Sequence, residues 1–353
     1  MKSEKKEKKK EGKKAAEKNS KKTEGLGNEE SKESKESKKN KESKETSEPE
    51  VPEVINVTRE TFGAIDIGSN AIRLLISYVE TYADKRTEYK KAAFIRVPIR
   101  LGDDVFMRGH ISSTKVEALS DAMQAFAALM RAYGVRDCRA CATSAMREAQ
   151  NGTDVVDNIK RVSGLNIEII SGEEEADTIY AAGGLKEVLD PKKNYVYVDV
   201  GGGSTEVVVY AHGAKTLERS FRLGTVRMLA GAVSEDEWNE FSSWLKAVRN
   251  EWKPEAIIGS GGNINKAHKM LEKKRREPIK AKELKQLYDQ TRKMSVTERM
   301  EQLYLNQSRA EVIANALKIF CTVADKCNID TIMVPRVGLV DGIVKGLMDK
   351  YSK

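Results

Sequence analysis

The sequence predicts an α/β protein of two related lobes behind a polar N-terminal tail. A duplication is indicated by two glycine-rich turns, each of which follows a short apolar run ending in an aspartate, Asp66 in one half and Asp199 in the other. In each half, three predicted strands come first, and strands that alternate with helices follow. Lysine and glutamate dominate the first 50 residues, which sets them apart from the rest of the chain.

The tail, residues 1–57, is predicted to be disordered. Its first 50 residues hold 17 Lys and 13 Glu and almost no apolar side chains, so nothing there offsets the conformational entropy lost on ordering. About half of the net charge of +8 belongs to this tail, so the remainder is only mildly basic and we expect no DNA or RNA partner. The chain shows no signal peptide and no membrane-spanning run, which favours a cytoplasmic protein without a membrane partner.

The first lobe is predicted to span residues 58–188 and the second residues 189–353. Strands are predicted from β-branched and aromatic runs at 62–79 (a hairpin), 92–97, 140–143, 167–170, 195–200, 206–211, 215–221, 256–258 and 331–334. Helices are predicted from apolar periodicity and capping residues at 115–133, 154–162, 171–185, 234–252, 263–276, 281–293, 295–304, 308–327 and 338–351.

Four cysteines and three histidines give little sign of a zinc or disulfide site. Cys138 and Cys141 have the spacing of a half-site, but Cys321 and Cys327 do not complete it, and the histidines are scattered. Reduced, buried cysteines of a cytoplasmic protein are the simpler interpretation.

The two glycine turns are candidate phosphate-binding loops. Glycines that tolerate positive φ let several backbone N–H groups point at one place, and neighbouring hydroxyls add further donors. A single turn of this kind is usually only a hairpin, but two at equivalent positions suggest two lobes that close on a phosphate chain. The predicted phosphate-binding residues are Gly68, Ser69, Asn70, Gly201, Gly202, Gly203, Ser204 and Thr205.

The aspartates before these turns are candidate metal ligands. Asp66 and Asp199 would repel a phosphate directly, and a divalent cation that bridges carboxylate and phosphate removes this conflict. Mg²⁺ is the expected ion, although another divalent cation would serve. The alternative is that both aspartates only accept hydrogen bonds from the N–H groups of their turns.

Two carboxylates and one arginine are candidate catalytic residues. Glu206 follows the second turn directly, and Glu175 ends an acidic run at a predicted helix start, where helix capping is the competing explanation. Either carboxylate could orient and deprotonate a water that attacks a phosphoanhydride. Arg147 follows a predicted strand and could hold a phosphoryl group, or form an ordinary surface ion pair.

A third strand–glycine–helix element covers residues 257–263. Behind it, Lys266, Lys269 and Lys273 would share one face of the predicted helix and could line a groove for a polyphosphate chain. A solvated helix face explains the same pattern.

Four stretches together resemble the exopolyphosphatase/guanosine pentaphosphate phosphohydrolase (Ppx/GppA) family of the actin–Hsp70–sugar kinase superfamily. The resemblance extends from about residue 58 to the end. The stretches are Ala-Ile-Asp-Ile-Gly-Ser-Asn at 64–70, Ala-Thr-Ser-Ala-Met-Arg at 142–147, Ile-Glu-Ile-Ile-Ser-Gly-Glu-Glu-Glu-Ala at 167–176 and Val-Asp-Val-Gly-Gly-Gly-Ser-Thr-Glu at 198–206.

This resemblance implies two ribonuclease-H-like lobes with an active site in the cleft between them. It also implies Mg²⁺-dependent release of terminal phosphate from inorganic polyphosphate or guanosine pentaphosphate (pppGpp), by a homodimer. Glu206 matches the family's water-activating glutamate, Glu175 a second glutamate needed for turnover, and Arg147 the arginine that holds phosphate. Both glycine turns match its phosphate-binding loops, and Asp199 matches its metal-associated aspartate.

The chain departs from the family near its C-terminus. The family's Gly-Leu-Arg-Glu-Gly reads Gly338-Leu339-Val340-Asp341-Gly342 here, so the Arg–Glu pair is lost and a role of this segment in the cleft or an interface is not expected to carry over. The chain also ends where longer members continue into a helical domain, which favours shorter polyphosphates or nucleotides as substrates.

Two other functions stay open at this point. A kinase of the same superfamily would transfer phosphate to an acceptor, but two glutamates in the cleft would activate water instead. A non-catalytic sensor of polyphosphate or nucleotides would bind without releasing phosphate.

Overall fold

The first sheet begins with a three-stranded antiparallel meander. The computed structural model describes residues 57–183 and 189–351, so the predicted tail lies outside it except for Val57. The strands of this sheet are β1 (Val57–Ile67), β2 (Ile72–Tyr82), β3 (Thr87–Val97), β4 (Asp137–Ala142) and β5 (Ile167–Ile169), in the order β3-β2-β1-β4-β5. β4 and β5 continue the sheet parallel to β1.

The second sheet repeats this plan. Its strands are β6 (Tyr195–Val200), β7 (Thr205–Ala211), β8 (Ala214–Phe221), β9 (Ala256–Ser260), β10 (Ile279–Lys280) and β11 (Thr331–Met333), in the order β10-β11-β9-β6-β7-β8. β6, β7 and β8 form the antiparallel meander, and β9 and β11 follow parallel to β6. The prediction of two related α/β lobes is confirmed.

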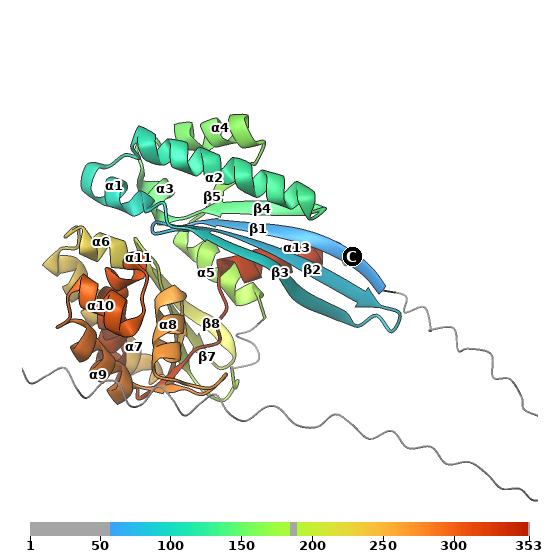
Figure 1. The fold of residues 1–353 in the computed structure, drawn as a ribbon. Helices are drawn as coiled ribbons and strands as arrows, with labels where there is room; N and C mark the ends of the chain where they lie inside the picture. The colour runs from blue at the N-terminus through green and yellow to red at the C-terminus, as the bar shows by residue number, and fades with distance from the viewer. Residues whose placement is uncertain (1–56, 184–188, 352–353) are drawn as a thin grey trace, which may run out of the picture. The chain divides into compact units, whose positions relative to one another are not determined.

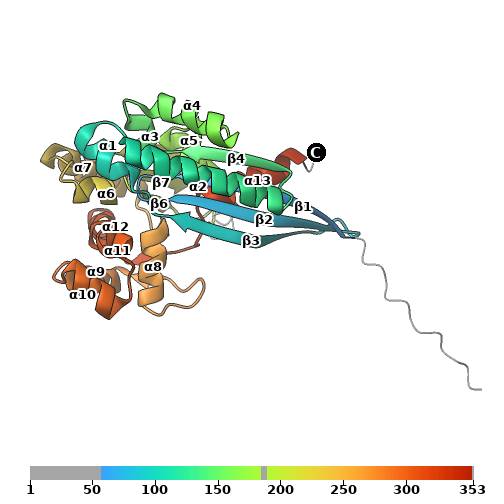
Figure 2. The same cartoon turned by 45° about the horizontal axis from the view of Figure 1, so that its top comes forward.

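Helices of the first half cover one face of the first sheet. They are α1 (Leu101–Arg108), α2 (Ser113–Ala132), α3 (Ser144–Glu148) and α4 (Gly152–Ser163). The remaining helix, α5 (Gly172–Ala181), joins the core on the other face of this sheet, with Phe62 of β1. Figures 1 and 2 show α2 and α4 on the same side of this sheet. Met123 and Phe126 of α2 join Ile65 and Ile67 of β1 in one buried core, which accounts for the apolar stripe along α2.

Helices of the second half also bury apolar side chains in a core against a sheet. They are α6 (Thr225–Leu229), α7 (Glu235–Trp252), α8 (Gly262–Met270), α9 (Ala281–Thr291), α10 (Val296–Leu303), α11 (Gln307–Ala310), α12 (Ile313–Cys327) and α13 (Leu339–Tyr351). Phe320 of α12 and Phe241 of α7 pack with Ile257 of β9 in a second core. Among the residues described, no helix is both long and apolar enough to cross a membrane.

Two helices, α5 and α13, pack in the core between the sheets. Ile343 of α13 lies in one core with Phe62 of the first sheet, and Ile179 of α5 lies in the same core beside Tyr210 of the second sheet. The helices touch backbone to backbone, because a Cβ atom added at Gly342 would lie 1.9 Å from the carbonyl oxygen of Thr178. The predicted boundary at 188/189 adjoins a gap in the described ranges and stays a prediction.

Three predicted helices differ from the structure. The helix predicted at 171–185 ends at Ala181, and residues 184–185 of that prediction lie outside the described ranges. The helix predicted at 263–276 ends at Met270, because the chain then turns back and the Nε2 of buried His268 donates to the carbonyl of Glu277 at 2.8 Å. The helix predicted at 308–327 is divided into α11 and α12. The short helices α1 and α6 were not predicted, since five to eight residues carry too little periodicity.

Candidate functional site

The turn between β1 and β2 (the first loop, residues 68–71) contacts the turn between β6 and β7 (the second loop, residues 201–204). A Cβ atom added at Gly202 would lie 2.7 Å from the Cβ of Ser69, and one added at Gly203 would lie 2.3 Å from the Oγ of Ser144. Glycine therefore permits the close approach. The hydroxyls of Ser69 and Ser144 are hydrogen-bonded at 2.8 Å. The structure thus brings the two predicted loops together.

The backbone carbonyls of the first loop are bound by the start of α1. The carbonyl of Ser69 accepts from the N–H of Gly102 at 2.8 Å, and that of Asn70 accepts from the N–H of Arg100 at 3.1 Å. Because these carbonyls are engaged, the N–H groups of the loop are left to face a ligand. An N–H group attracts anions, whereas a carbonyl repels them.

The second loop is held in the same way by α6. Its glycine carbonyls accept hydrogen bonds from Thr225 N–H to Gly201 at 3.0 Å, from Val226 N–H to Gly202 at 2.8 Å and from Arg227 Nε–H to Gly203 at 2.7 Å. In the described part of the chain, no hydrogen bond uses the amides of Ser69, Asn70, Gly202 or Gly203. Engaged carbonyls and open amides favour an anion, and binding of phosphate by these loops stays a prediction.

Three buried carboxylates lie beside these loops. Asp66 is close to the end of β1, and Asp199 of β6 faces Glu206 of β7 as its cross-strand partner. The hydroxyls of Ser204 and Ser220 both donate to the Oε1 of Glu206, at 2.6 and 3.1 Å. Glu206 is therefore held at the base of the second loop.

Burial and mutual repulsion shift these groups toward their neutral forms. Burial, followed by repulsion from Glu206 and Asp66, raises the pKa of Asp199 to about 7. Burial also raises the pKa of Glu206, although the Ser204 and Ser220 hydroxyls oppose the rise. The pKa of half-buried Glu175, on the first turn of α5, is raised well above its ordinary value by burial and then by Glu206, Asp199 and Asp66. Glu175 therefore shares one electrostatic environment with the other three.

Two arginines enter this acidic cluster from the first half. Arg73 of β2 forms an ion pair with Asp66, which raises the pKa of the guanidinium. Arg147 of α3 donates to the carbonyl of Ile170, and its charge opposes the rise in the pKa of both Glu175 and Glu206. Arg147 thus lies near the two glutamates, and its binding of a phosphoryl group stays a prediction.

Sequence reasoning missed a group of arginines from both halves. Burial, followed by the charges of Arg73 and Arg309, lowers the pKa of Arg96 on β3 to about 10. Burial and then Arg73 lower the pKa of Arg309 on α11 as well. A signal did exist for two of them, because Arg73 and Arg96 each interrupt an apolar strand; Arg309 has no local signal.

The predicted lysine groove is only partly assembled. Burial, then Lys269 and Arg309, lower the pKa of half-buried Lys266, which places Lys266 beside the arginine group. Lys273 lies beyond the end of α8, and its ammonium bonds the carboxylate of Glu283 at 2.8 Å. Lys273 thus does not share the predicted helix face, and binding of a phosphate chain by Lys266 and Lys269 stays a prediction.

The duplicated sheet topology and the paired loops define an actin-like α/β protein of two lobes. The model of the Ppx/GppA phosphatase family matches residues 93–351, and the chain belongs to this family. The family resemblance seen in the sequence is confirmed. The matched range contains the second loop, Glu175 and Arg147 but begins after the first loop.

Known relatives agree with this assignment. The chain is 26% identical over 302 residues to the guanosine-5'-triphosphate,3'-diphosphate pyrophosphatase of Aeromonas salmonicida. The aligned region covers 81% of this chain and 59% of that relative. The chain thus spans about three fifths of the length of such curated relatives.

Solved structures confirm the fold. The Ppx/GppA family member of Aquifex aeolicus is 24% identical with a TM-score of 0.66, over 84% of this chain and all of that one. An exopolyphosphatase from Cytophaga hutchinsonii is 22% identical with a TM-score of 0.71, over 82% of this chain and 98% of that one.

Proposed function

We propose that this chain is a phosphohydrolase that releases the terminal phosphate of inorganic polyphosphate. The observation that carries the proposal is the pair of facing loops whose amides are open, with four acidic side chains beside them. Membership of a phosphatase family supports it. Hydrolysis of the 5'-terminal phosphate of pppGpp is the alternative, favoured by the name of the Aeromonas relative.

The loops would bind the terminal phosphates. Amides of Ser69, Asn70, Gly202 and Gly203 would donate to phosphate oxygens from two sides, and Arg147 would add a charged donor. The guanidinium groups of Arg96 and Arg309 repel each other, and an anion bound between them would relieve this repulsion. This arrangement favours a substrate with several phosphates.

Glu206 and Glu175 would handle the attacking water. A general base works best when its pKa lies near the working pH, and burial moves Glu206 in that direction. The two hydroxyls that donate to Glu206 restrict its rotation, so that the carboxylate is already oriented when water binds. Half-buried Glu175 would support the water or a cation from the start of α5.

A divalent cation such as Mg²⁺ fits Asp199 and the first loop. Asp199 is a hard oxygen ligand that forms no direct ion pair in the described ranges, although the charge of nearby Arg73 acts on it. The buried Oδ1 of Asn70 has no hydrogen-bond partner there. Asp66 is already paired with Arg73 and would contribute less. No group of three or more His, Cys, Asp or Glu side chains among the described residues could hold an ion, so substrate phosphates would complete the coordination. When bound, the ion would stabilise charge on the transferred phosphoryl group.

Phosphate release from tripolyphosphate, long polyphosphate and pppGpp, with and without Mg²⁺, tests the proposal. Glu206→Gln should lower kcat at least ~100-fold and leave binding nearly unchanged. Glu218→Gln is the matched control, because Glu218 lies on the next strand and bonds Lys215 instead. Binding without release from any of the three substrates would support the sensor instead. Size-exclusion chromatography tests the expected homodimer.

A further inference from the structure

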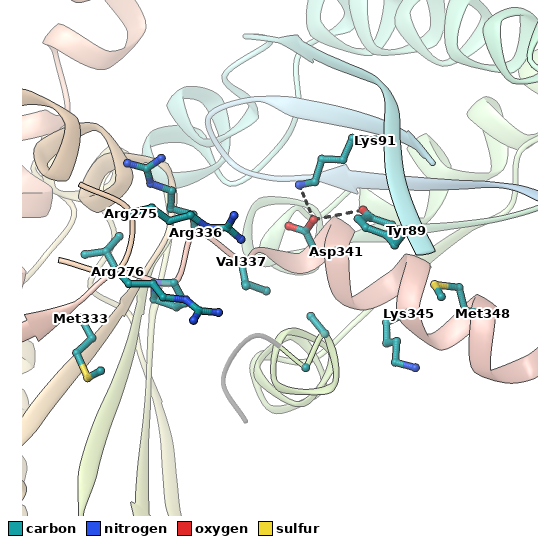
Figure 3. Close-up of a pocket in the computed structure, with 14 residues that line it drawn as sticks. Tyr89, Lys91, Arg275, Arg276, Met333, Arg336, Val337, Asp341, Lys345 and Met348 are labelled. Atoms are coloured by element: carbon teal, nitrogen blue, oxygen red, sulfur yellow. Dashed lines mark hydrogen bonds and ion pairs between the residues drawn. The ribbon is translucent and has the colours of Figure 1, made fainter. Parts of the chain in front are cut away.

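A cavity of about 850 Å³ lies between β3, the residues that follow α5, the segment that follows α8, the segment that follows β11 and one side of α13. None of the carboxylates or loops described above lines it. Figure 3 shows Arg275, Arg276 and Arg336 gathered on one side and Tyr89, Lys91 and Asp341 on another. The cavity is therefore a separate feature of the fold that the proposed reaction does not use.

The lining is strongly basic. Within the described ranges it carries one carboxylate, that of Asp341, and five cationic side chains: Lys91, Arg275, Arg276, Arg336 and Lys345. Asp341 is already engaged, because it pairs with Lys91 at 2.6 Å and accepts the N–H of Gly338 at 3.0 Å. Lys345 is also engaged, because it forms an ion pair with Asp349 of the same helix. Arg275 and Arg336 are therefore the cations that carry the case for a ligand, and a bound anion would relieve the repulsion between their charges.

A buried histidine orients Arg336 without neutralising it. The Nε2 of His268 donates to the carbonyl of Glu277, so in the neutral ring Nδ1 is an acceptor, and Arg336 donates to it at 3.1 Å. Arg336 also has a left-handed backbone, with a φ of 60°. A guanidinium fixed by an uncharged partner keeps its charge for a ligand.

The rest of the wall is apolar. Met333 and Val337 lie close to the arginines in Figure 3, and Met348 lies beside Lys345. Arginine binds phosphate in a bidentate manner and stacks on flat rings, so this lining suits a phosphate chain with or without an attached base. We propose that the cavity is a second anion site, which binds an oligophosphate supplied by inorganic polyphosphate or by a nucleotide.

Calorimetric titration of the full chain with tripolyphosphate tests this second site. The Glu206→Gln background prevents hydrolysis, and the buffer is kept at low ionic strength. Arg275→Ala removes an exposed lining cation, and Arg336→Gln removes the oriented one. Lys274→Ala is the matched control, because Lys274 is an exposed cation in the same segment that does not line the cavity.

We expect two binding events in the background protein and in the Lys274→Ala control. In each arginine variant, one event should weaken at least ~10-fold, with the circular dichroism spectrum unchanged. Titrations with ADP and with monophosphate separate the sources: tighter binding of ADP identifies a nucleotide, and tighter binding of tripolyphosphate identifies the polymer.

Equal binding by both arginine variants and the control would overturn the second site. If only one event occurs and the arginine variants abolish it, the cavity binds the ligand and the catalytic loops do not. That result contradicts the proposed function and leaves the second site intact.

Discussion

Arg227 of α6 and Glu148 of α3 form an ion pair that links the two halves of the chain beside the second loop. The guanidinium of Arg227 also donates to the carbonyl of Gly203 at 2.7 Å and lies 4.0 Å from the ring centre of Phe106. Only 2% of Arg227 is exposed, whereas the side chain of Arg222, which reaches the same Glu148, is 67% exposed. Arg227 therefore fixes the loop to both halves at once.

Replacing Arg227 should be more costly than replacing Arg222. Arg227→Met leaves the buried carbonyl of Gly203 without its donor and leaves Glu148 with only the exposed Arg222, so we expect the free energy of unfolding to fall by about 1–3 kcal/mol. Arg222→Met removes a solvated ion pair and should cost less than about 1 kcal/mol. Urea unfolding of both variants measures the difference. Equal losses would show that Arg227 has no special structural role.

Two glycines of α13 should respond to alanine in opposite ways. A methyl group at Gly342 meets the carbonyl of Thr178 at 1.9 Å, so Gly342→Ala should force α5 and α13 apart and cost about 1–3 kcal/mol or more. No atom lies within 4 Å of the Cβ position at Gly346, where alanine should stabilise the helix by about 0.5–1 kcal/mol. Thermal unfolding distinguishes them. Two variants with the same sign of change would contradict the observed helix contact.

Glu175→Gln should reduce turnover strongly and leave the fold intact. Its carboxylate shares the electrostatic environment of Glu206 and Asp199, so we expect kcat to fall by about 100-fold. Glu173→Gln, on the same helical turn but exposed, should leave kcat within about twofold, because general acid–base effects need contact with the reacting groups. Steady-state phosphate release measures both. Similar kcat values for the two variants would remove Glu175 from the reaction.

The pKa of Asp199 predicts how stability depends on pH in metal-free buffer. Its pKa rises from 3.8 to about 7 on folding, so the folded state holds a proton that the unfolded state has already lost between these values. Through Asp199, the free energy of unfolding should therefore decrease as the pH rises from about 4 to about 7, and stay level above that. The total contribution is at most about 4 kcal/mol.

Asp199→Asn should remove this part of the slope. The variant should match the unmodified chain near pH 4 and be more stable at pH 8, as measured by urea unfolding in EDTA. A variant that is less stable than the unmodified chain at pH 8 would show that the charged carboxylate is stabilised in the fold. Added Mg²⁺ should narrow the difference at pH 8, since a cation favours the charged form of Asp199.

Local patterns were enough to locate most strands and both loops. β6 has the predicted bounds of 195–200, because six consecutive β-branched, aromatic and acidic residues precede a glycine turn. The second loop could be recognised for the same reason, because a tight turn requires glycine or another permissive residue at adjacent positions of the sequence. The change in the C-terminal motif could also be recognised from the sequence. Nothing in the sequence indicated that Lys91 of β3 forms an ion pair with Asp341 of that motif.

Chain order and residue type were thus sufficient for the duplicated α/β plan, the acidic residues and the glycine loops, because each of these depends on neighbours within a few positions. Packing alone decided that α13 lies against the first sheet, that Arg309 joins Arg96, and that Arg227 binds the second loop. These contacts join segments that are distant in the chain. Each contact is stabilised by burial and charge that both segments contribute together. Neither segment alone therefore shows a sequence pattern that predicts the contact.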